Sequence, residues 1–368
     1  MKKKGRIVMK WRETVKEIAP YVPGKSIELV KEELGLDEVI RLASNENPLG
    51  PSQKALDAMQ AALPDAHLYP DAPATELRVR LASLYGVDAD QIITGNGADN
   101  IISVLISAYV DEGDEVLYGS PTFPAYRSST LLMGGTPVEV PLTDDFTFDL
   151  EGLKAKVTDK TKLIFICNPN NPTGTVVDSD ALENFVKGLP DHVRVVLDEA
   201  YIEYVEQEDY TTGIDLFKKG YPVITTRTFS KYYGLAGLRV GYAIAHQDVL
   251  EPMLRLREPF AVNRLAIIAA LATLDDEDYM ALHAKMNREG KAYLTAELEK
   301  LGFLVYPSQS NFLFVDLKRK SDDIFDGLLK KGFIIRPCNS WGYDQHVRIS
   351  IGTQEQNEGL MKALQAVM

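Results

Sequence analysis

Four segments of the chain place polar side chains directly after short runs of apolar and β-branched residues. These segments begin near Gly95, Asn168, Asp198 and Arg227. Ligands of parallel α/β sheets bind beyond the carboxyl ends of the strands, so side chains that follow predicted strands are the first candidates for a site. We therefore examine what chemistry each segment allows.

The first segment has the pattern of an anion site. A predicted strand, 91–94, runs into Gly95-Asn-Gly97-Ala98-Asp99-Asn100 and then into a helix. Free backbone N–H groups at Gly97, Ala98 and Asp99 would face an anion at the positive end of the helix dipole. The alternative is a plain strand-to-helix turn with an aspartate in the first helical turn.

The second and third segments supply an amide and a carboxylate. In Asn168-Pro-Asn-Asn171-Pro-Thr-Gly174, two prolines deny the chain helical geometry and hold Asn171 at a fixed angle. Asp198 follows the buried apolar run 193–197. A charge buried there is costly unless it meets a cation, although Asp198 could instead cap the N-terminus of a helix.

The fourth segment carries an amine beside phosphate-binding groups. Lys231 follows Ser230, and a glycine-rich loop then turns back to Arg239. The turn can return Arg239 to the neighbourhood of Thr228 and Ser230, so that hydroxyls and a guanidinium are available to a phosphate. A surface lysine with a structural arginine is the alternative.

Together the four segments meet the needs of pyridoxal phosphate. This cofactor requires a lysine for its covalent link, a carboxylate that keeps its ring nitrogen protonated, and an anion site for its phosphate. Convergence of all these groups weakens the alternative interpretation of each segment. No residue is expected to bind a metal, since the five histidines are scattered without metal-ligand spacing.

The same strings resemble the fold type I aminotransferases over almost the whole chain. The resemblance rests on the segment 168–174, on Asp198-Glu-Ala-Tyr201 and on Ser230-Lys231 with Arg239 eight positions later. Within that family the chain looks most similar to the histidinol-phosphate aminotransferases. That likeness is carried by the strings Leu42-Ala-Ser-Asn-Glu-Asn-Pro-Leu-Gly50, His67-Leu-Tyr-Pro-Asp71, Leu235-Ala-Gly-Leu-Arg239 and Val347-Arg-Ile-Ser-Ile-Gly352.

The resemblance implies a role for each matching residue around the cofactor. Lys231 would bind the cofactor covalently and move the substrate proton as general acid and base. Asp198 would pair with the ring nitrogen, while Asn171 and Tyr201 would hydrogen-bond the 3′ oxygen. Phe123 would stack on the ring, unless it is an ordinary core aromatic.

It also implies residues that recognise the substrate and a second subunit. Arg348 matches the family's carboxylate-binding arginine, and Arg336 is the candidate second cation, with a strand-end surface arginine as the alternative. Asn47 lies in a segment that resembles the one closing over the substrate. Tyr69 would reach the cofactor phosphate of a neighbouring subunit in a homodimer with shared sites, or it is simply a loop aromatic.

The reaction implied is transamination of L-histidinol phosphate with 2-oxoglutarate in histidine biosynthesis. Histidinol phosphate carries no α-carboxylate, so its phosphate ester would occupy the region that holds the carboxylate of glutamate in the other half-reaction. Aromatic amino-acid aminotransferases share the same pattern, and a threonine-phosphate decarboxylase would use the same site residues. These two activities remain alternatives.

The elements that would position these residues belong to an α/β fold of the fold type I class, with a mostly parallel, seven-stranded sheet between helices. A smaller α+β domain follows. We expect residues 1–45 to form an N-terminal helix and loop that pack with the small domain, 46–250 the large cofactor-binding domain, and 251–368 the small domain. Long helices are predicted at 249–274 and 277–301. The predicted strands are 91–94, 115–118, 137–141, 162–167, 193–197, 223–226 and 239–245 in the large sheet, and 302–305, 311–316, 333–336 and 347–351 after it.

Composition limits the partners and the compartment. The 368 residues carry a formal net charge of −13, which disfavours nucleic acid and anionic membranes as partners. Two cysteines, Cys167 and Cys338, cannot form a disulfide framework, so we expect a cytoplasmic protein. No apolar run of signal length follows the basic start, and either Met1 or Met9 could be the natural first residue.

Overall fold

The central element is a seven-stranded sheet in the order β2-β8-β7-β6-β5-β3-β4. The structure is a computed structural model that describes residues 10–20 and 24–368. In this sheet β8 runs antiparallel to both of its neighbours, and the other strands are parallel to one another. The predicted fold class is therefore confirmed. The strands are β2 (Ile92–Gly95), β3 (Glu115–Ser120), β4 (Thr136–Pro141), β5 (Thr161–Cys167), β6 (Arg194–Asp198), β7 (Val223–Thr228) and β8 (Gly241–Ile244).

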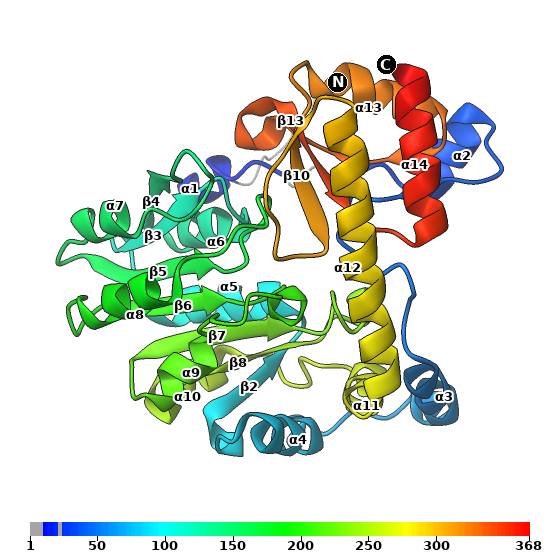
Figure 1. The fold of residues 1–368 in the computed structure, drawn as a ribbon. Helices are drawn as coiled ribbons and strands as arrows, with labels where there is room; N and C mark the ends of the chain where they lie inside the picture. Colours follow the sequence, from blue (N-terminus) through cyan, green and yellow to red (C-terminus); the bar gives the residue numbers. More distant parts are fainter. Residues whose placement is uncertain (1–9, 21–23) are drawn as a thin grey trace, which may run out of the picture.

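Helices cover both faces of this sheet (Figure 1). They bury β5, β6 and β7 so completely that nearly every residue in these strands is inaccessible, as expected for parallel strands covered on both faces. The helices that follow the first strands are α5 (Ala98–Tyr109), α6 (Ala125–Met133), α7 (Leu150–Ala155), α8 (Ser179–Lys187) and α9 (Gly213–Lys218).

A second core lies around a smaller sheet in the order β12-β13-β10-β9. The long helix α12 (Glu277–Lys300) runs from the side of the large sheet to this second core (Figure 1). The remaining elements are β9 (Leu304–Val305), β10 (Phe312–Asp316), β11 (Phe333–Ile334), β12 (Arg336–Cys338), β13 (Tyr343–Ser350), α13 (Ser321–Lys330) and α14 (Gln354–Val367).

The part of the N-terminal segment that contains α2 and β1 packs against this smaller part, whereas the short helix before it contacts α6 beside the large sheet. Strand β1 (Ile40–Arg41) pairs with β11, and Val30 of α2 (Ile27–Leu34) is buried in a cluster with Ile334. The single N-terminal helix expected within residues 1–45 is divided into α2 and the short α1 (Glu13–Lys16). The alternative start at Met9 lies outside the described residues.

Two predicted elements are divided in the structure. The helix expected at 249–274 is split into α10 (Gln247–Leu256) and α11 (Arg264–Leu274). Pro259 disfavours helical geometry in the residue before it, and the side chain of Asn263 caps a new helix by accepting from Ala266 N. The strand expected at 333–336 becomes β11 and β12, which join different sheets.

The large core extends beyond the predicted domain boundary. That boundary, at residues 250 and 251, falls inside α10, and buried side chains of both α10 and α11 belong to the large core. Helix α11 packs against α3 (Gln53–Ala62) and α4 (Thr75–Tyr85). Among the described residues, no helix is both long and apolar enough to cross a membrane.

Candidate active site

Lys231 lies in the loop that joins β7 to β8. These strands are antiparallel neighbours, so the loop starts and ends at one place, where Phe229 N donates to Val240 O at 3.0 Å. Lys231 Nζ donates to the backbone oxygen of Ser44 at 3.0 Å. Burial, assisted by the positive charge of Arg348, lowers the pKa of Lys231 to about 8. This amine can therefore lose and regain a proton near neutral pH.

Asp198 ends β6 and is almost completely buried. Its Oδ2 accepts a hydrogen bond of 2.6 Å from the hydroxyl of Tyr126. Its Oδ1 is also buried, but accepts no hydrogen bond from any residue that the structure describes. Burial raises the pKa of Asp198 to about 6, although the Tyr126 hydrogen bond opposes this change. A cationic N–H group from a ligand would satisfy the remaining oxygen.

A group of side chains and backbone N–H groups that could hold an anion lies where the Lys231 loop meets the start of α5. Arg239 Nη1 donates to Ser230 Oγ at 3.2 Å, and its Nη2 lies 3.6 Å from Asp99 Oδ2. Gly97 has a φ of +84°, and a Cβ added there would lie 2.4 Å from Arg239 Nη2. Only glycine lets the guanidinium come this close to the helix start. Thr228 lies behind Ser230 and accepts a hydrogen bond from its N–H at 3.1 Å.

One detail of the predicted anion site is wrong. The N–H of Gly97 is not free, because it donates to Gly95 O at 2.8 Å and closes the turn. Helix α5 begins at Ala98, and the first N–H groups of a helix have no acceptor within it. The N–H groups of Ala98 and Asp99 are therefore still available to an anion.

Arg348 connects the smaller part of the molecule to the segment 168–174. It is buried on β13, and its guanidinium donates to Ala43 O at 2.6 Å and to the side-chain oxygen of Asn171. Nearby, Tyr201 accepts a hydrogen bond of 3.0 Å from the side chain of Asn45. Lys231 Nζ lies 5.8 Å from the centroid of the Tyr201 ring. Four of the predicted residues thus lie around one location: Asn171, Tyr201, Lys231 and Arg348.

Arg336 joins this group from the neighbouring strand. It is the register partner of Arg348, and the guanidinium carbon of each arginine lies 5.9 Å from the ring of Trp341. Trp341 Nε1 in turn donates to Thr122 O at 2.8 Å. The residue after Thr122 is Phe123, which is partly buried and meets the Tyr126 ring edge-on.

Two predicted residues lie apart from this cluster. The side chain of Asn47 is buried behind the Lys231 loop, where it donates to Tyr232 O at 2.9 Å and to the Tyr279 hydroxyl at 2.7 Å. Its contacts are thus with the protein's own chain. Tyr69 is 78% exposed and stacks on Phe260 with ring centroids 4.4 Å apart.

Three residues of the site were missed from the sequence. Tyr126 follows Phe123 by three positions at the start of α6, a helical spacing that could have indicated a shared direction. Asn45 adopts a φ of +56°, which asparagine tolerates better than most residues. Trp341 had no local signal, because its position depends on the docking of β12 and β13 against the large sheet.

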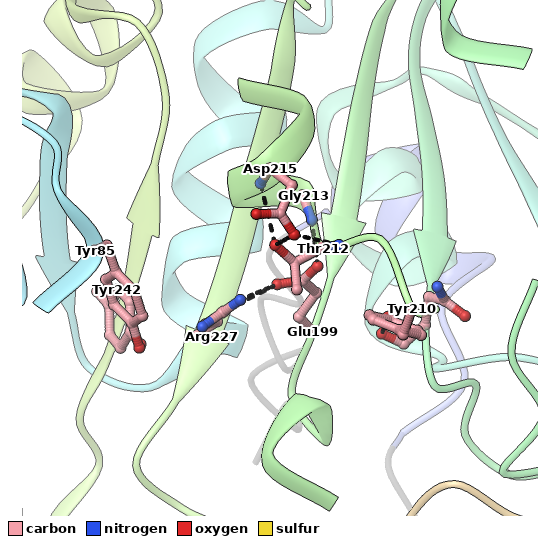
Figure 2. Close-up of polar contacts among 9 residues, drawn as sticks. Tyr85, Glu199, Tyr210, Thr212, Gly213, Asp215, Arg227 and Tyr242 are labelled. Atoms are coloured by element: carbon pink, nitrogen blue, oxygen red, sulfur yellow. Dashed lines mark hydrogen bonds and ion pairs between the residues drawn. The ribbon is translucent and has the colours of Figure 1, made fainter. Parts of the chain in front are cut away.

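Glu199, the neighbour of Asp198, has a complete set of partners. Arg227 donates to its Oε2 from Nε at 2.9 Å and from Nη2 at 2.7 Å, and Gly213 N donates to its Oε1 (Figure 2). Arg227 also lies over the ring of Tyr85, 4.9 Å from its centroid. This buried ion pair fixes the start of α9 to β6 and β7.

Comparison with known proteins identifies the family of the chain. The profile of the family described as aminotransferase class I and II matches residues 37–364. A histidinol-phosphate aminotransferase of Moorella thermoacetica is 47% identical over 98% of this chain and 94% of its own. One of Caldicellulosiruptor saccharolyticus is 41% identical over 97% of this chain and all of its own.

Solved structures show the same fold. A histidinol-phosphate aminotransferase from Sinorhizobium meliloti, in complex with pyridoxal-5′-phosphate, superposes with a TM-score of 0.87 at 28% identity, covering 98% of both chains. An aspartate aminotransferase from Thermus thermophilus, at 23% identity and a TM-score of 0.84, shares the fold. Given a family match over most of its length and these relatives, the chain belongs to the class I and II aminotransferases.

Proposed function

We propose that this aminotransferase uses pyridoxal phosphate to transfer the amino group of L-histidinol phosphate to 2-oxoglutarate. The products are imidazole acetol phosphate and L-glutamate, and the pathway served is histidine biosynthesis. The observation that carries the proposal is the pair Arg336 and Arg348, which face each other in register beside Asn171. Relatives at 41 to 47% identity that bear this activity in their names support it.

The residues present fit the cofactor. Asp198 Oδ1 is a buried oxygen in need of a donor, as a protonated ring nitrogen would supply. Arg239, Ser230 and the N-terminus of α5 form a cradle for a phosphate, which the absence of a Cβ at Gly97 keeps open. When bound, pyridoxal phosphate supplies a carbonyl that links to amines and a ring that stabilises negative charge on the adjacent carbon.

The chain's own groups then handle protons and orientation. Lys231, with its pKa lowered to about 8, is suited to take the proton from the substrate carbon and return it during transfer. Tyr201 and Asn171 would hydrogen-bond the ring oxygen. The hydroxyl of Tyr201 already accepts from Asn45, so its own hydrogen can be donated.

Two cations suit a substrate that carries a phosphate ester. A phosphate has about twice the charge of a carboxylate at neutral pH and more acceptor oxygens. Arg348 would meet the carboxylate of glutamate and the phosphate of histidinol phosphate in turn. Arg336 would add the second set of donors that the phosphate requires.

Two alternatives use the same scaffold but are not favoured. An aromatic amino-acid aminotransferase would need no second cation beside Arg348. A threonine-phosphate decarboxylase would release carbon dioxide and need no oxo acid. The names of the relatives give neither activity support.

The proposal is tested by steady-state kinetics with two donors and two variants. The unaltered enzyme should have a kcat/KM for histidinol phosphate at least about tenfold above that for phenylalanine, a difference of about 1.4 kcal/mol. Arg336→Gln should reduce kcat/KM for histidinol phosphate and leave that for glutamate nearly unchanged, whereas Arg348→Gln should reduce both. Preference for phenylalanine would contradict the proposal, and Lys231→Ala protein that still transaminated would contradict the chemistry.

We further propose a homodimer in the cytoplasm. The exposed stack of Tyr69 on Phe260 is an aromatic surface that a second subunit can cover. Tyr69 would then serve the cofactor phosphate of the partner. Light scattering should give twice the chain mass, and Tyr69→Phe should weaken cofactor binding; a monomer with full activity would contradict this part.

A further inference from the structure

Tyr126 is held more rigidly than its position beside a loop suggests. It is fully buried in the first turn of α6, and its ring stacks on Phe165 with centroids 4.4 Å apart. The ring edge of Phe123 and the tilted ring of Tyr118 lie 5.8 Å and 6.0 Å away. These contacts fix the ring, and so they fix the direction in which its hydroxyl points.

The hydroxyl reaches one oxygen of a carboxylate whose other oxygen is unsatisfied. Tyr126 donates to Asp198 Oδ2 at 2.6 Å, a short, charge-assisted distance. Asp198 Oδ1 is buried with no hydrogen-bond partner among the described residues. Without the hydroxyl, the carboxylate could turn about its own bond and present either oxygen.

The hydroxyl also affects how strongly Asp198 holds a proton. Burial raises the pKa of this carboxyl, and the hydrogen bond from Tyr126 lowers it. Cys167 lies beside Asp198 on β5, but burial raises the pKa of its thiol, so the thiol stays neutral. Asp99, the other carboxylate that acts on Asp198, raises its pKa.

We propose that Tyr126 is a positioning residue for Asp198: it occupies Oδ2, directs Oδ1 toward the ring nitrogen of the cofactor, and keeps the shared proton on that nitrogen. This rests on the proposed use of pyridoxal phosphate. The proton lies between two bases, the carboxylate and the ring nitrogen. A carboxylate that already accepts a hydrogen bond is the weaker base, so the proton remains on the ring.

The test compares Tyr126→Phe with Tyr118→Phe. Both variants remove one phenol hydroxyl from the same aromatic cluster, but the Tyr118 hydroxyl donates to Glu139 at 3.3 Å, whereas that of Tyr126 donates to Asp198. Each protein is reconstituted with pyridoxal phosphate labelled with ¹⁵N in the ring. The readouts are the ¹⁵N resonance of that nitrogen and the dissociation constant of the cofactor.

For Tyr126→Phe the resonance should move toward the value of an unprotonated ring. The dissociation constant should rise about tenfold, since a hydrogen bond to a charged group is lost. Tyr118→Phe should match the unaltered enzyme in both. A Tyr126→Phe protein with an unchanged resonance and a dissociation constant within about twofold would overturn the positioning role.

Two further outcomes are distinguishable. If the unaltered protein does not bind pyridoxal phosphate, the proposed function fails and the role of Tyr126 fails with it. If Tyr126→Phe does not fold, as judged by circular dichroism, 4-aminophenylalanine is placed at position 126 instead. Its aniline N–H is a weaker donor than the phenol, so the resonance should still move toward the unprotonated value, and an unchanged resonance would overturn the proposal.

Discussion

Asp198 and Glu199 are adjacent, buried carboxylates at the end of one strand, and they differ in how far the protein satisfies them. Glu199 accepts from Arg227 twice and from Gly213 N, so both of its oxygens are bonded. Asp198 accepts from Tyr126 at Oδ2, and its Oδ1 accepts no hydrogen bond from the described residues. Successive residues of a strand point to opposite faces, so one carboxylate is directed to each side of the sheet.

This difference separates a structural ion pair from a ligand site. Burying a carboxylate is costly, and the protein offsets that cost at Glu199 with a cation of its own. At Asp198 the cost is left partly uncompensated until a cationic ligand arrives. An incomplete hydrogen-bond set in a well-packed interior is therefore a stronger indication of function than a buried charge by itself.

Of the substitutions that compare the two carboxylates, Asp198→Asn should have the largest effect, and that effect should be a loss of activity. An amide cannot hold the proton of the ring nitrogen as a carboxylate does, so kcat should fall at least about 10³-fold, or roughly 4 kcal/mol in the barrier. The cofactor-free variant should be no less stable than the unaltered protein in urea, because a neutral amide removes a buried, unsatisfied charge. Retention of more than a tenth of the activity would remove the distinction between the two carboxylates.

Arg227→Met should instead act on stability. It leaves Glu199 buried without its counter-charge, which typically costs about 3 to 5 kcal/mol. The free energy of unfolding from urea titration measures the loss. The double variant Glu199→Met, Arg227→Met should recover most of it, since an apolar pair needs no compensation. If the double variant is as unstable as the single one, the ion pair is not what Arg227 contributes.

The smallest effect is a difference in pH dependence. Asp198 titrates at about 6 in the folded, cofactor-free protein and has a reference pKa of 3.8. A raised pKa favours folding at low pH, and that contribution is lost as the pH rises through 6. The Asp198→Asn protein has no group that titrates at this position, so its free energy of unfolding does not fall in this way. The difference in free energy of unfolding between the variant and the unaltered protein should therefore increase by about 2 kcal/mol, in favour of the variant, between pH 4.5 and 7.5. Urea unfolding at several pH values, without cofactor, provides the measurement; parallel curves would show that Asp198 is satisfied in the folded state.

The sequence allowed much of this site to be predicted, because its central residues follow strands. Lys231, Ser230 and Arg239 lie within ten positions, and the antiparallel pairing of β7 and β8 brings the ends of their loop together. The positions of the strands in the large sheet and the family also followed from local patterns, but the order of the strands did not. These signals come from residues that are close in the sequence, namely the spacing of apolar residues and the residue types that favour turns.

What could not be predicted depends on packing between distant segments. Trp341 reaches the two arginines because β12 and β13 dock near Thr122, more than 200 positions earlier. Asn47 was assigned to the substrate from its segment, but its hydrogen bonds to Tyr232 and Tyr279 arise from the way α12 lies against the Lys231 loop. The break between α10 and α11 had a local cause in Pro259, whose effect outweighed the apolar pattern on either side.

The loop between Phe229 and Val240 has a consequence for how this chain can vary. Its two ends are joined by a hydrogen bond between Phe229 and Val240, and it presents Lys231 and Arg239 to the same ligand. Inserting or deleting one residue would shift the lysine against the arginine, so that a single event would remove both the covalent anchor and the phosphate contact. We expect this loop to keep a constant length among functional descendants, while the surface loops around it gain and lose residues freely.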